Sequence, residues 1–244
     1  MHKLPRLPAL SPEPESGHIR VIESGDQLMA LQQEERIWIE PAYYAMGYRT
    51  ATNVIILRQG TIAALRRASS LLPGDYSLVV WDGLRTLRTQ REIAERFSSE
   101  LSANFEDAHK NPEILEKYVA PVPTSEREFL AMPPPHTTGG AIDITLGDSV
   151  GRKLDLGAGF DEFGPNAATD YYERSSLKMC SDVTDTLRRD LRRLLYFAMT
   201  GAGFAPYPFE YWHFEYGTRR HAAFYRKSVA AYGPAVAFTL NGVL

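Results

Sequence analysis

Two short stretches, far apart in the sequence, carry the residue types that bind catalytic metals. The stretch PPPHTTGGAIDITL contains His136 and Asp143, and the stretch FEYWHFEYG contains Glu210 and His213. Catalytic zinc usually takes three protein ligands from His, Asp and Glu and leaves its fourth position to water. We therefore predict that His136, Asp143 and His213 bind zinc, although this set also suits other divalent metals. Glu210 is then the expected base that acts on the water.

The spacing of His136 and Asp143 requires a bend in the chain. On a regular strand, side chains seven residues apart point to opposite faces. Gly139 and Gly140 lie between the two residues, and glycine tolerates positive φ and close backbone approach. Asp143 then falls in the sequence Ala-Ile-Asp-Ile-Thr-Leu, which alternates in the manner of a strand. We expect the bend to bring His136 back towards Asp143.

The spacing of Glu210 and His213 favours a turn that enters a strand. Pro206 and Pro208 precede the pair, and the surrounding run is aromatic. Glu210 would lie in the turn and His213 in the strand. Spacing alone leaves an alternative open, because E-x-x-H is common by chance and a histidine among aromatic residues is often a core residue.

The motifs resemble those of a known family. HTTGGAID resembles the H-x-x-G-x-A-x-D signature of the LAS-type zinc peptidases, and EYWH resembles their E-x-W-H element. More narrowly, the chain is similar to the D-alanyl-D-alanine dipeptidases of the vancomycin-resistance type. WDGLR at residues 81–85, LDLGAGFDEFG at residues 154–164 and the helix, glycine turn and strand that end in EYWH match further segments in the same order. The resemblance covers residues 37–217.

The resemblance implies a role for each matched residue. The implied zinc ligands are His136, Asp143 and His213, and the implied catalytic base is Glu210. Arg85 matches the arginine that stabilises the developing oxyanion, and Asp161 matches the aspartate that holds the free amino group of the substrate. Without the resemblance, Arg85 would read as a solvated arginine at a helix start, and Asp161 as a turn-capping residue.

Three departures from the family pattern bear on the prediction. Pro134 stands where the family usually has a serine, two residues before the first zinc histidine. Leu84-Arg85-Thr86 replaces the usual Y-R-P, and WIEPAYYAMGYRTATN only loosely echoes the N-terminal substrate-binding segment. The first and last departures concern substrate recognition and leave the hydrolytic residues intact.

Composition narrows the class of protein. The chain has 244 residues, 44% hydrophobic residues and a net charge of −3, so we expect no nucleic-acid partner. The single cysteine, Cys180, excludes an intrachain disulfide and fits a reducing compartment. The proline-rich N-terminus does not resemble a signal peptide, and the apolar tail from Ser228 is too short to span a membrane. We expect a cytoplasmic protein with no membrane partner, built of a flexible arm (residues 1–17) and a single zinc peptidase domain (residues 18–244).

Local patterns predict the elements around the motifs. Helices are expected at residues 62–72, 87–101 and 182–200, a buried strand at residues 77–81, and a glycine-rich loop that lines the cleft at residues 150–170. The last helix carries Arg188, Arg189, Arg192 and Arg193, which we expect to be a solvated face partly offset by acidic neighbours. The aromatic segment at residues 37–53 either borders the cleft or packs at the edge of the core, and the sequence does not decide between them.

These observations predict an α+β fold, with a mostly antiparallel central sheet that carries the zinc ligands and helices packed on one side. The predicted function is zinc-dependent hydrolysis of a small D-containing dipeptide, with D-alanyl-D-alanine as the expected substrate and one zinc ion per chain. One alternative is a peptidoglycan D,D- or L,D-carboxypeptidase or endopeptidase of the same zinc class, against which the absence of an export signal weighs. Another is a non-catalytic zinc-binding module, against which the presence of Glu210 and Arg85 weighs.

Overall fold

The computed structural model describes the chain except for residues 1–3, 11–15, 105–118, 163, 176–182 and 238–244, so Cys180 lies outside the described residues. A five-stranded sheet forms its centre, with the strand order β3-β5-β6-β8-β7. The strands are β3 (Ile37–Ile39), β5 (Tyr76–Asp82), β6 (Ala141–Asp148), β8 (His213–Glu215) and β7 (Ala205–Pro206). Only the β3–β5 pair among these is parallel. The predicted mostly antiparallel sheet is therefore confirmed.

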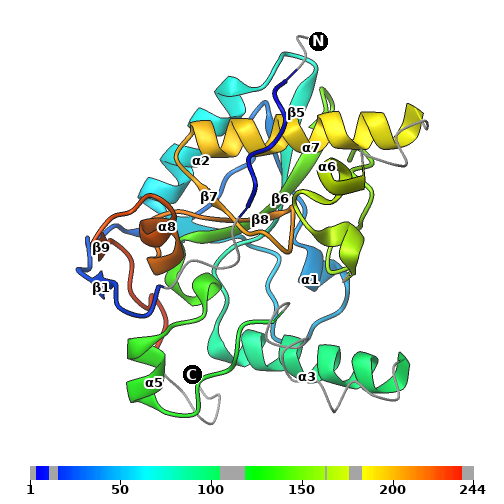
Figure 1. Ribbon diagram of the computed structural model, residues 1–244. Helices are drawn as coiled ribbons and strands as arrows, with labels where there is room; N and C mark the ends of the chain where they lie inside the picture. Colours follow the sequence, from blue (N-terminus) through cyan, green and yellow to red (C-terminus); the bar gives the residue numbers. More distant parts are fainter. Residues whose placement is uncertain (1–3, 11–15, 105–118, 163, 176–182, 238–244) are drawn as a thin grey trace.

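Two long helices cover one side of this sheet, and the others surround it. The helices are α1 (Ala42–Ala45), α2 (Gln59–Leu71), α3 (Leu87–Asn104), α5 (Glu126–Ala131), α6 (Tyr171–Ser175), α7 (Val183–Gly201) and α8 (Arg219–Phe224). Short 3-10 turns η2 (Pro135–Thr138) and η3 (Pro165–Ala167) interrupt the loops. Two small two-stranded sheets pair β1 (Arg20–Val21) with β9 (Val229–Ala230), and β2 (Leu28–Ala30) with β4 (Ile56–Arg58). Figure 1 shows α2 and α7 together on one side of the sheet, with α3 and α5 on the other.

The core between the sheet and the helices α2 and α7 follows from the apolar periodicity of each element. Leu78 and Val80 on β5 and Ile144 on β6 are fully buried, and Leu65 of α2 and Leu195 of α7 pack in the same cluster. Burial of one large aliphatic side chain stabilises a fold by about 1.5–3 kcal/mol. This core holds β6 and β8, the two strands that carry predicted ligands, in a fixed position. Among the described residues, no helix has both the length and the apolar character that a membrane crossing requires.

The basic run on α7 differs from its prediction. Arg188 and Arg189 pair with nearby aspartates, but Arg192 and Arg193 are only 3% and 7% exposed. The expectation of a solvated face is therefore wrong for these two arginines. The reason is tertiary, because loops and the N-terminal segment cover this side of the helix. Buried arginine is tolerated where its donors find carbonyl or carboxylate partners.

Each buried arginine organises a segment of chain. Arg192 donates to the carbonyl oxygens of Leu156, Asn166 and Ala168 at 2.6–2.8 Å and thereby fixes the glycine-rich loop. Arg193 pairs with buried Glu173, which also accepts a hydrogen bond from the backbone of Leu7.

Part of the segment that was expected to be a flexible arm lies against this pair. Leu7 is buried, and the Leu4 carbonyl accepts a hydrogen bond from Arg193 at 3.3 Å. Between Leu4 and Leu7 the chain is therefore docked against the Arg193–Glu173 pair of α7 and α6.

Candidate metal centre and active site

The three predicted metal ligands lie together. His136 Nε2 is 3.2 Å from His213 Nδ1 and 3.3 Å from Asp143 Oδ2, and His213 Nδ1 is 3.0 Å from Asp143 Oδ1. All three side chains are buried. Within the described part of the chain, this is the one group of at least three His, Cys, Asp or Glu side chains placed to share a metal ion.

The fold explains why these residues meet. β6 and β8 are antiparallel neighbours, and their register places Asp143 directly opposite His213. Side chains at such opposed positions lie on the same face of the sheet, within contact distance. Neither motif specifies this pairing, because it depends on how the two strands align in the sheet.

The predicted bend brings His136 to the same place. Pro135–Thr138 forms the turn η2, and Gly139 follows with φ 73°, a left-handed conformation that favours glycine. Gly140 lies close to the backbone just after β8. A Cβ atom on residue 140 would lie 2.3 Å from the Tyr216 carbonyl oxygen. Both glycines of the motif are therefore required by the backbone, as the spacing predicted.

The donor set fits zinc. Tetrahedral coordination with bonds of about 2.0–2.1 Å places ligand atoms about 3.3 Å apart. The two histidine nitrogens are 3.2 Å apart and His136 Nε2 is 3.3 Å from Asp143 Oδ2, which is close to this value, while His213 Nδ1 approaches the other carboxylate oxygen, Oδ1, at 3.0 Å. The outward-facing nitrogen of each histidine has an acceptor, namely the Gly83 carbonyl for His136 at 2.7 Å and Glu215 for His213 at 3.2 Å. These contacts leave His136 Nε2 and His213 Nδ1 available for a metal.

Arg85 lies beside the cluster. It follows β5, and its backbone N–H donates to the His136 carbonyl at 3.1 Å. Its guanidinium donates to Asp82 and Gln90 and, at 2.9 Å, to the Asp143 oxygen Oδ2. A permanently charged group is thus fixed next to a predicted ligand, and it faces the cavity.

Asp161 lies on the same side of the cavity as Arg85. Its carboxylate accepts a hydrogen bond from the Tyr43 hydroxyl at 2.7 Å, and the Arg85 guanidinium lies 4.9 Å from the centre of the Tyr43 ring. The preceding Phe160 packs against Tyr43 and Trp81. Asp161 has φ 55°, which aspartate tolerates better than most residues. Burial raises its pKa to about 7.

Glu210 lies in the connection between β7 and β8, where the sequence predicted a turn. The next residue, Tyr211, is fixed by a backbone hydrogen bond to Ala167 and by a hydroxyl hydrogen bond to the Ala158 carbonyl. Glu210 is buried and lines the same cavity as the cluster. Burial raises the pKa of Glu210 to about 8, and a nearby positive charge would lower it again.

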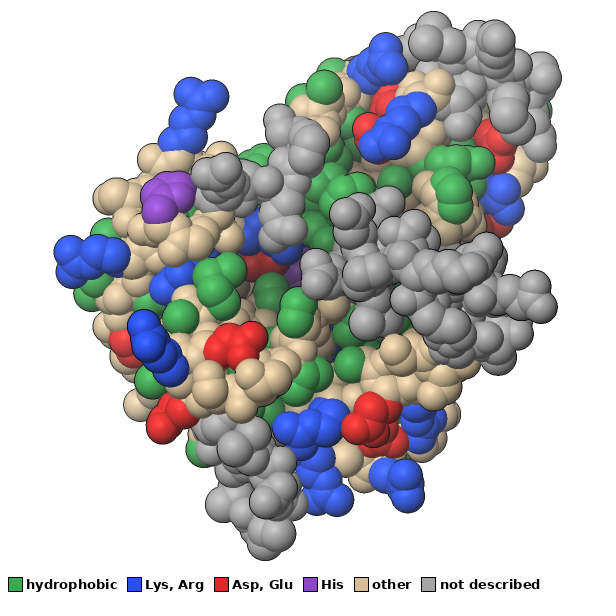
Figure 2. Space-filling view, turned by 60° about the horizontal axis from the view of Figure 1, so that its bottom comes forward, with side chains coloured by type: hydrophobic (Ala, Val, Ile, Leu, Met, Phe, Trp, Pro, Cys, Tyr) green, Lys and Arg blue, Asp and Glu red, His purple; other side chains and the backbone are tan. Residues whose placement is uncertain are grey.

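The cavity that contains these residues has a volume of about 290 Å³. Figure 2 looks onto this side of the molecule, where acidic and histidine side chains are visible at the bottom of a hollow rimmed by hydrophobic side chains. The hydrophobic part of its lining includes Ile93, Val119, Met132 and Pro134. A polar floor and a largely apolar wall are the usual features of a small-molecule site.

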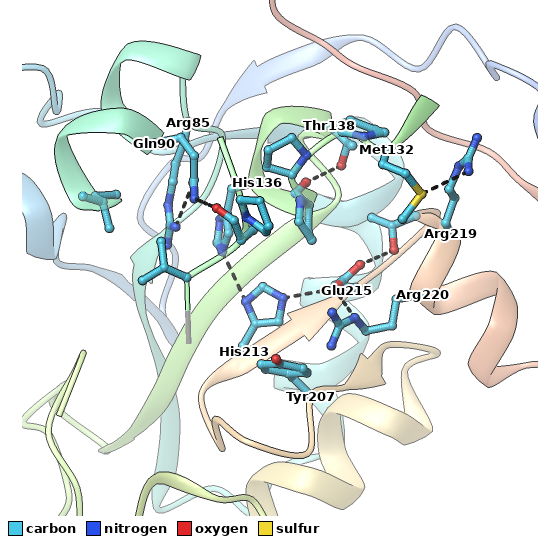
Figure 3. A pocket seen from close by; sticks show the side chains of 18 of the residues that line it. Arg85, Gln90, Met132, His136, Thr138, Tyr207, His213, Glu215, Arg219 and Arg220 are labelled. Carbon is cyan, nitrogen blue, oxygen red and sulfur yellow. Dashed lines mark hydrogen bonds and ion pairs between the residues drawn. The ribbon is translucent and has the colours of Figure 1, made fainter. Parts of the chain in front are cut away.

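Sequence reasoning did not identify several cavity residues. Tyr43 belongs to the aromatic segment that was expected either at the cleft or at the edge of the core. The structure places Tyr43 at the cavity. Glu215 and Tyr207 were not identified at all. Glu215 could have been identified from its spacing, because side chains two residues apart on a strand, such as His213 and Glu215, share a face. In Figure 3, Glu215 lies on the side of His213 that faces away from His136, with Arg220 next to it.

Comparisons with known proteins identify the family of the chain. The family model described as D-ala-D-ala dipeptidase matches residues 46–230. A D-alanyl-D-alanine dipeptidase of Synechocystis sp. is 29% identical over 216 residues, which is 82% of this chain and 85% of the relative. The Escherichia coli K12 enzyme of the same name is 45% identical over 80 residues, 33% of this chain and 36% of the relative.

A zinc-containing crystal structure of the vancomycin resistance D,D-pentapeptidase VanY is more distant, with a TM-score of 0.40 and 15% identity over 88% of this chain and 97% of that one. The match of the family model over most of the chain decides the assignment. The protein belongs to the D-Ala-D-Ala dipeptidase family and is a peptidase.

Proposed function

We propose that the protein hydrolyses free D-alanyl-D-alanine, with one zinc ion per chain bound by His136, Asp143 and His213. The observation that carries the proposal is a cavity that combines a two-histidine, one-aspartate cluster with Glu210, Arg85 and Asp161. The Synechocystis and E. coli relatives are named for this activity. The single cysteine supports a cytoplasmic location as part of the same proposal.

Each residue of the cavity has a separate role in the proposed reaction. His136, Asp143 and His213 would hold the zinc ion, which would supply a Lewis acid to polarise the scissile carbonyl and lower the pKa of water. Glu210 accepts a proton from the attacking water and transfers it to the departing amine. Arg85 stabilises the negative charge that develops on the carbonyl oxygen, because its guanidinium is already fixed beside Asp143. Asp161 pairs with the ammonium group of the substrate, and the Tyr43 hydroxyl orients its carboxylate.

The test is an assay of zinc-loaded protein against D,D-, L,D- and L,L-dipeptides, together with elemental analysis. We expect release of D-alanine from D-alanyl-D-alanine, and about one zinc per chain in protein purified without chelator. His136→Ala should lose both the zinc and the activity. The proposal is wrong if the fully loaded protein leaves D-alanyl-D-alanine intact, or if His136→Ala keeps its full zinc content.

Arg85→Lys tests the role of the guanidinium. Lysine keeps the positive charge but loses the planar pair of donors that bridge Asp82 and Asp143. We expect kcat to fall by roughly 10²-fold, with a much smaller change in KM, because the contact strengthens only as charge develops on the oxygen. Steady-state kinetics on D-alanyl-D-alanine measure both constants. A change confined to KM would instead assign Arg85 to ground-state binding.

A further inference from the structure

Glu215 lies directly behind a predicted zinc ligand and has no role in the proposed reaction. Its side chain is 1% exposed, and its Oε1 atom is 3.2 Å from His213 Nε2. The other ring nitrogen, Nδ1, faces His136 and Asp143. The imidazole of His213 therefore lies between the metal cluster and a buried carboxylate.

Strand geometry fixes this contact. His213 and Glu215 are two residues apart on β8, so their side chains project from the same face of the strand. Glu215 is paired in register with Ala141 on one side and with Ala205 on the other. Both neighbouring strands thus hold the backbone of Glu215, and this fixes the position of Glu215 relative to His213.

Two further groups hold the carboxylate itself. The Thr218 hydroxyl donates to Oε2, and the Arg220 Nε atom is 2.8 Å from Oε1. The Arg220 guanidinium lies 4.0 Å from the centre of the Tyr207 ring, and that ring is 5.6 Å from the His213 ring. Figure 3 shows Tyr207, Arg220 and Glu215 around the imidazole. The charge of Arg220 offsets the cost of burying the carboxylate.

The chemistry of a histidine ligand requires such a partner. To bind a metal through Nδ1, His213 must carry its proton on Nε2, and an acceptor at Nε2 selects that tautomer. A carboxylate acceptor also makes the ligating nitrogen more basic than a neutral acceptor does. The hydrogen-bond acceptor for His136 Nδ1 is the neutral Gly83 carbonyl at 2.7 Å, and the Asp82 carboxylate lies further away at 3.6 Å. Glu215 is therefore the charged acceptor of the two hydrogen bonds.

We propose that Glu215 is the positioning residue for the metal centre, which holds His213 in its Nε2–H tautomer and strengthens its bond to zinc. This inference rests on the proposed zinc site. It assigns a function to Glu215 that is separate from the chemistry of Glu210, because Glu215 acts on the metal only through His213.

The test compares zinc dissociation constants, measured by competition with a chelator, for the unmodified protein, Glu215→Gln and Glu173→Gln. Glutamine at position 215 keeps the size and an acceptor oxygen but loses the charge. We expect zinc affinity to fall about 10–100-fold, and the absorption spectrum of the cobalt-substituted protein to change. Glu173→Gln is the matched control, because Glu173 is also buried and paired with an arginine, Arg193, but lies outside the cavity. It should lower the melting temperature without changing zinc affinity.

The outcomes separate this inference from the proposed function. A zinc dissociation constant of Glu215→Gln equal to that of the unmodified protein overturns the role of Glu215. Zinc binding by the unmodified protein without dipeptide hydrolysis overturns the proposed function alone, and failure to bind zinc overturns both. If Glu215→Gln does not fold, nitrogen-15 NMR of the zinc-loaded unmodified protein tests the proposal by measuring the tautomer of His213. The Nε2–H tautomer of His213 is expected, and the Nδ1–H tautomer would overturn the proposal.

Discussion

Replacing Glu210 by glutamine is expected to lower kcat for D-alanyl-D-alanine by about 10²–10⁴-fold, which is the usual contribution of a general base. The amide has nearly the same shape as the carboxylate but cannot accept a proton from water. Because Glu210 is proposed as a base and not as a ligand, the variant should keep its zinc. The measurements are single-turnover kinetics and zinc content.

The control for Glu210→Gln is again Glu173→Gln, which removes a buried carboxylate outside the cavity and should leave kcat unchanged. Near-normal turnover by Glu210→Gln would show that another group accepts the proton. Loss of zinc from that variant would show that Glu210 is a ligand, and the assignment of the cluster would then have to change.

The residues of the site were predictable where a motif fixes the local backbone. The glycine pair between His136 and Asp143 required a bend, and the structure has a left-handed glycine at Gly139. The prolines before Glu210 required a turn that enters a strand, and β8 begins at His213. In each case the physical constraint lies within a few residues of sequence, so the pattern alone carries it.

Contacts between distant segments could not be predicted in this way. The pairing of β6 with β8 places Asp143 opposite His213, and no local pattern specifies that register. The same limitation explains the wrong prediction for Arg192, whose three carbonyl partners come from the loop at residues 156–168. A charged residue on a helix is usually solvated, and only the tertiary structure shows where a loop covers it.

The position of Tyr43 shows an intermediate case. Its aromatic segment was expected either at the cleft or at the edge of the core, and Tyr43 does both. Its ring packs in a cluster with Tyr48 and Ile93, while its hydroxyl reaches Asp161. An amphipathic side chain can satisfy both interpretations at once, so hydrophobicity alone could not separate them.

Acetylation of the substrate amine is expected to reduce kcat/KM by roughly a thousandfold or more, because of Asp161. The free dipeptide brings an ammonium group that pairs with this carboxylate, whereas the blocked form leaves the carboxylate unpaired in a largely desolvated position. Above its pKa Asp161 is ionised, and loss of the partner of a buried ion pair then costs several kcal/mol. The comparison of D-alanyl-D-alanine with its N-acetyl form measures this discrimination directly.

Asp161→Ala should narrow the difference between the two substrates mainly by slowing cleavage of the free dipeptide. The matched control is Asp155→Ala, which removes an aspartate from the same loop. Asp155 pairs with Arg188, and its side chain is 64% exposed, outside the catalytic cavity. It should leave the ratio of the two kcat/KM values unchanged. Equal cleavage of free and blocked dipeptide by the unmodified protein would favour a carboxypeptidase over a dipeptidase.

The pH dependence of this ratio isolates Asp161 from the catalytic base. Burial raises the pKa of Asp161 to about 7, so its carboxylate becomes protonated as the pH falls through that value. A neutral carboxyl group no longer requires a cation, and the preference for the free dipeptide should therefore shrink below about pH 7. Protonation of Glu210 slows both substrates equally and cancels in the ratio. A ratio that stays constant between about pH 5.5 and pH 7.5, a range in which the substrate amine, with a pKa of about 7.7–8.0, stays mostly protonated, would show that another group selects the free amine.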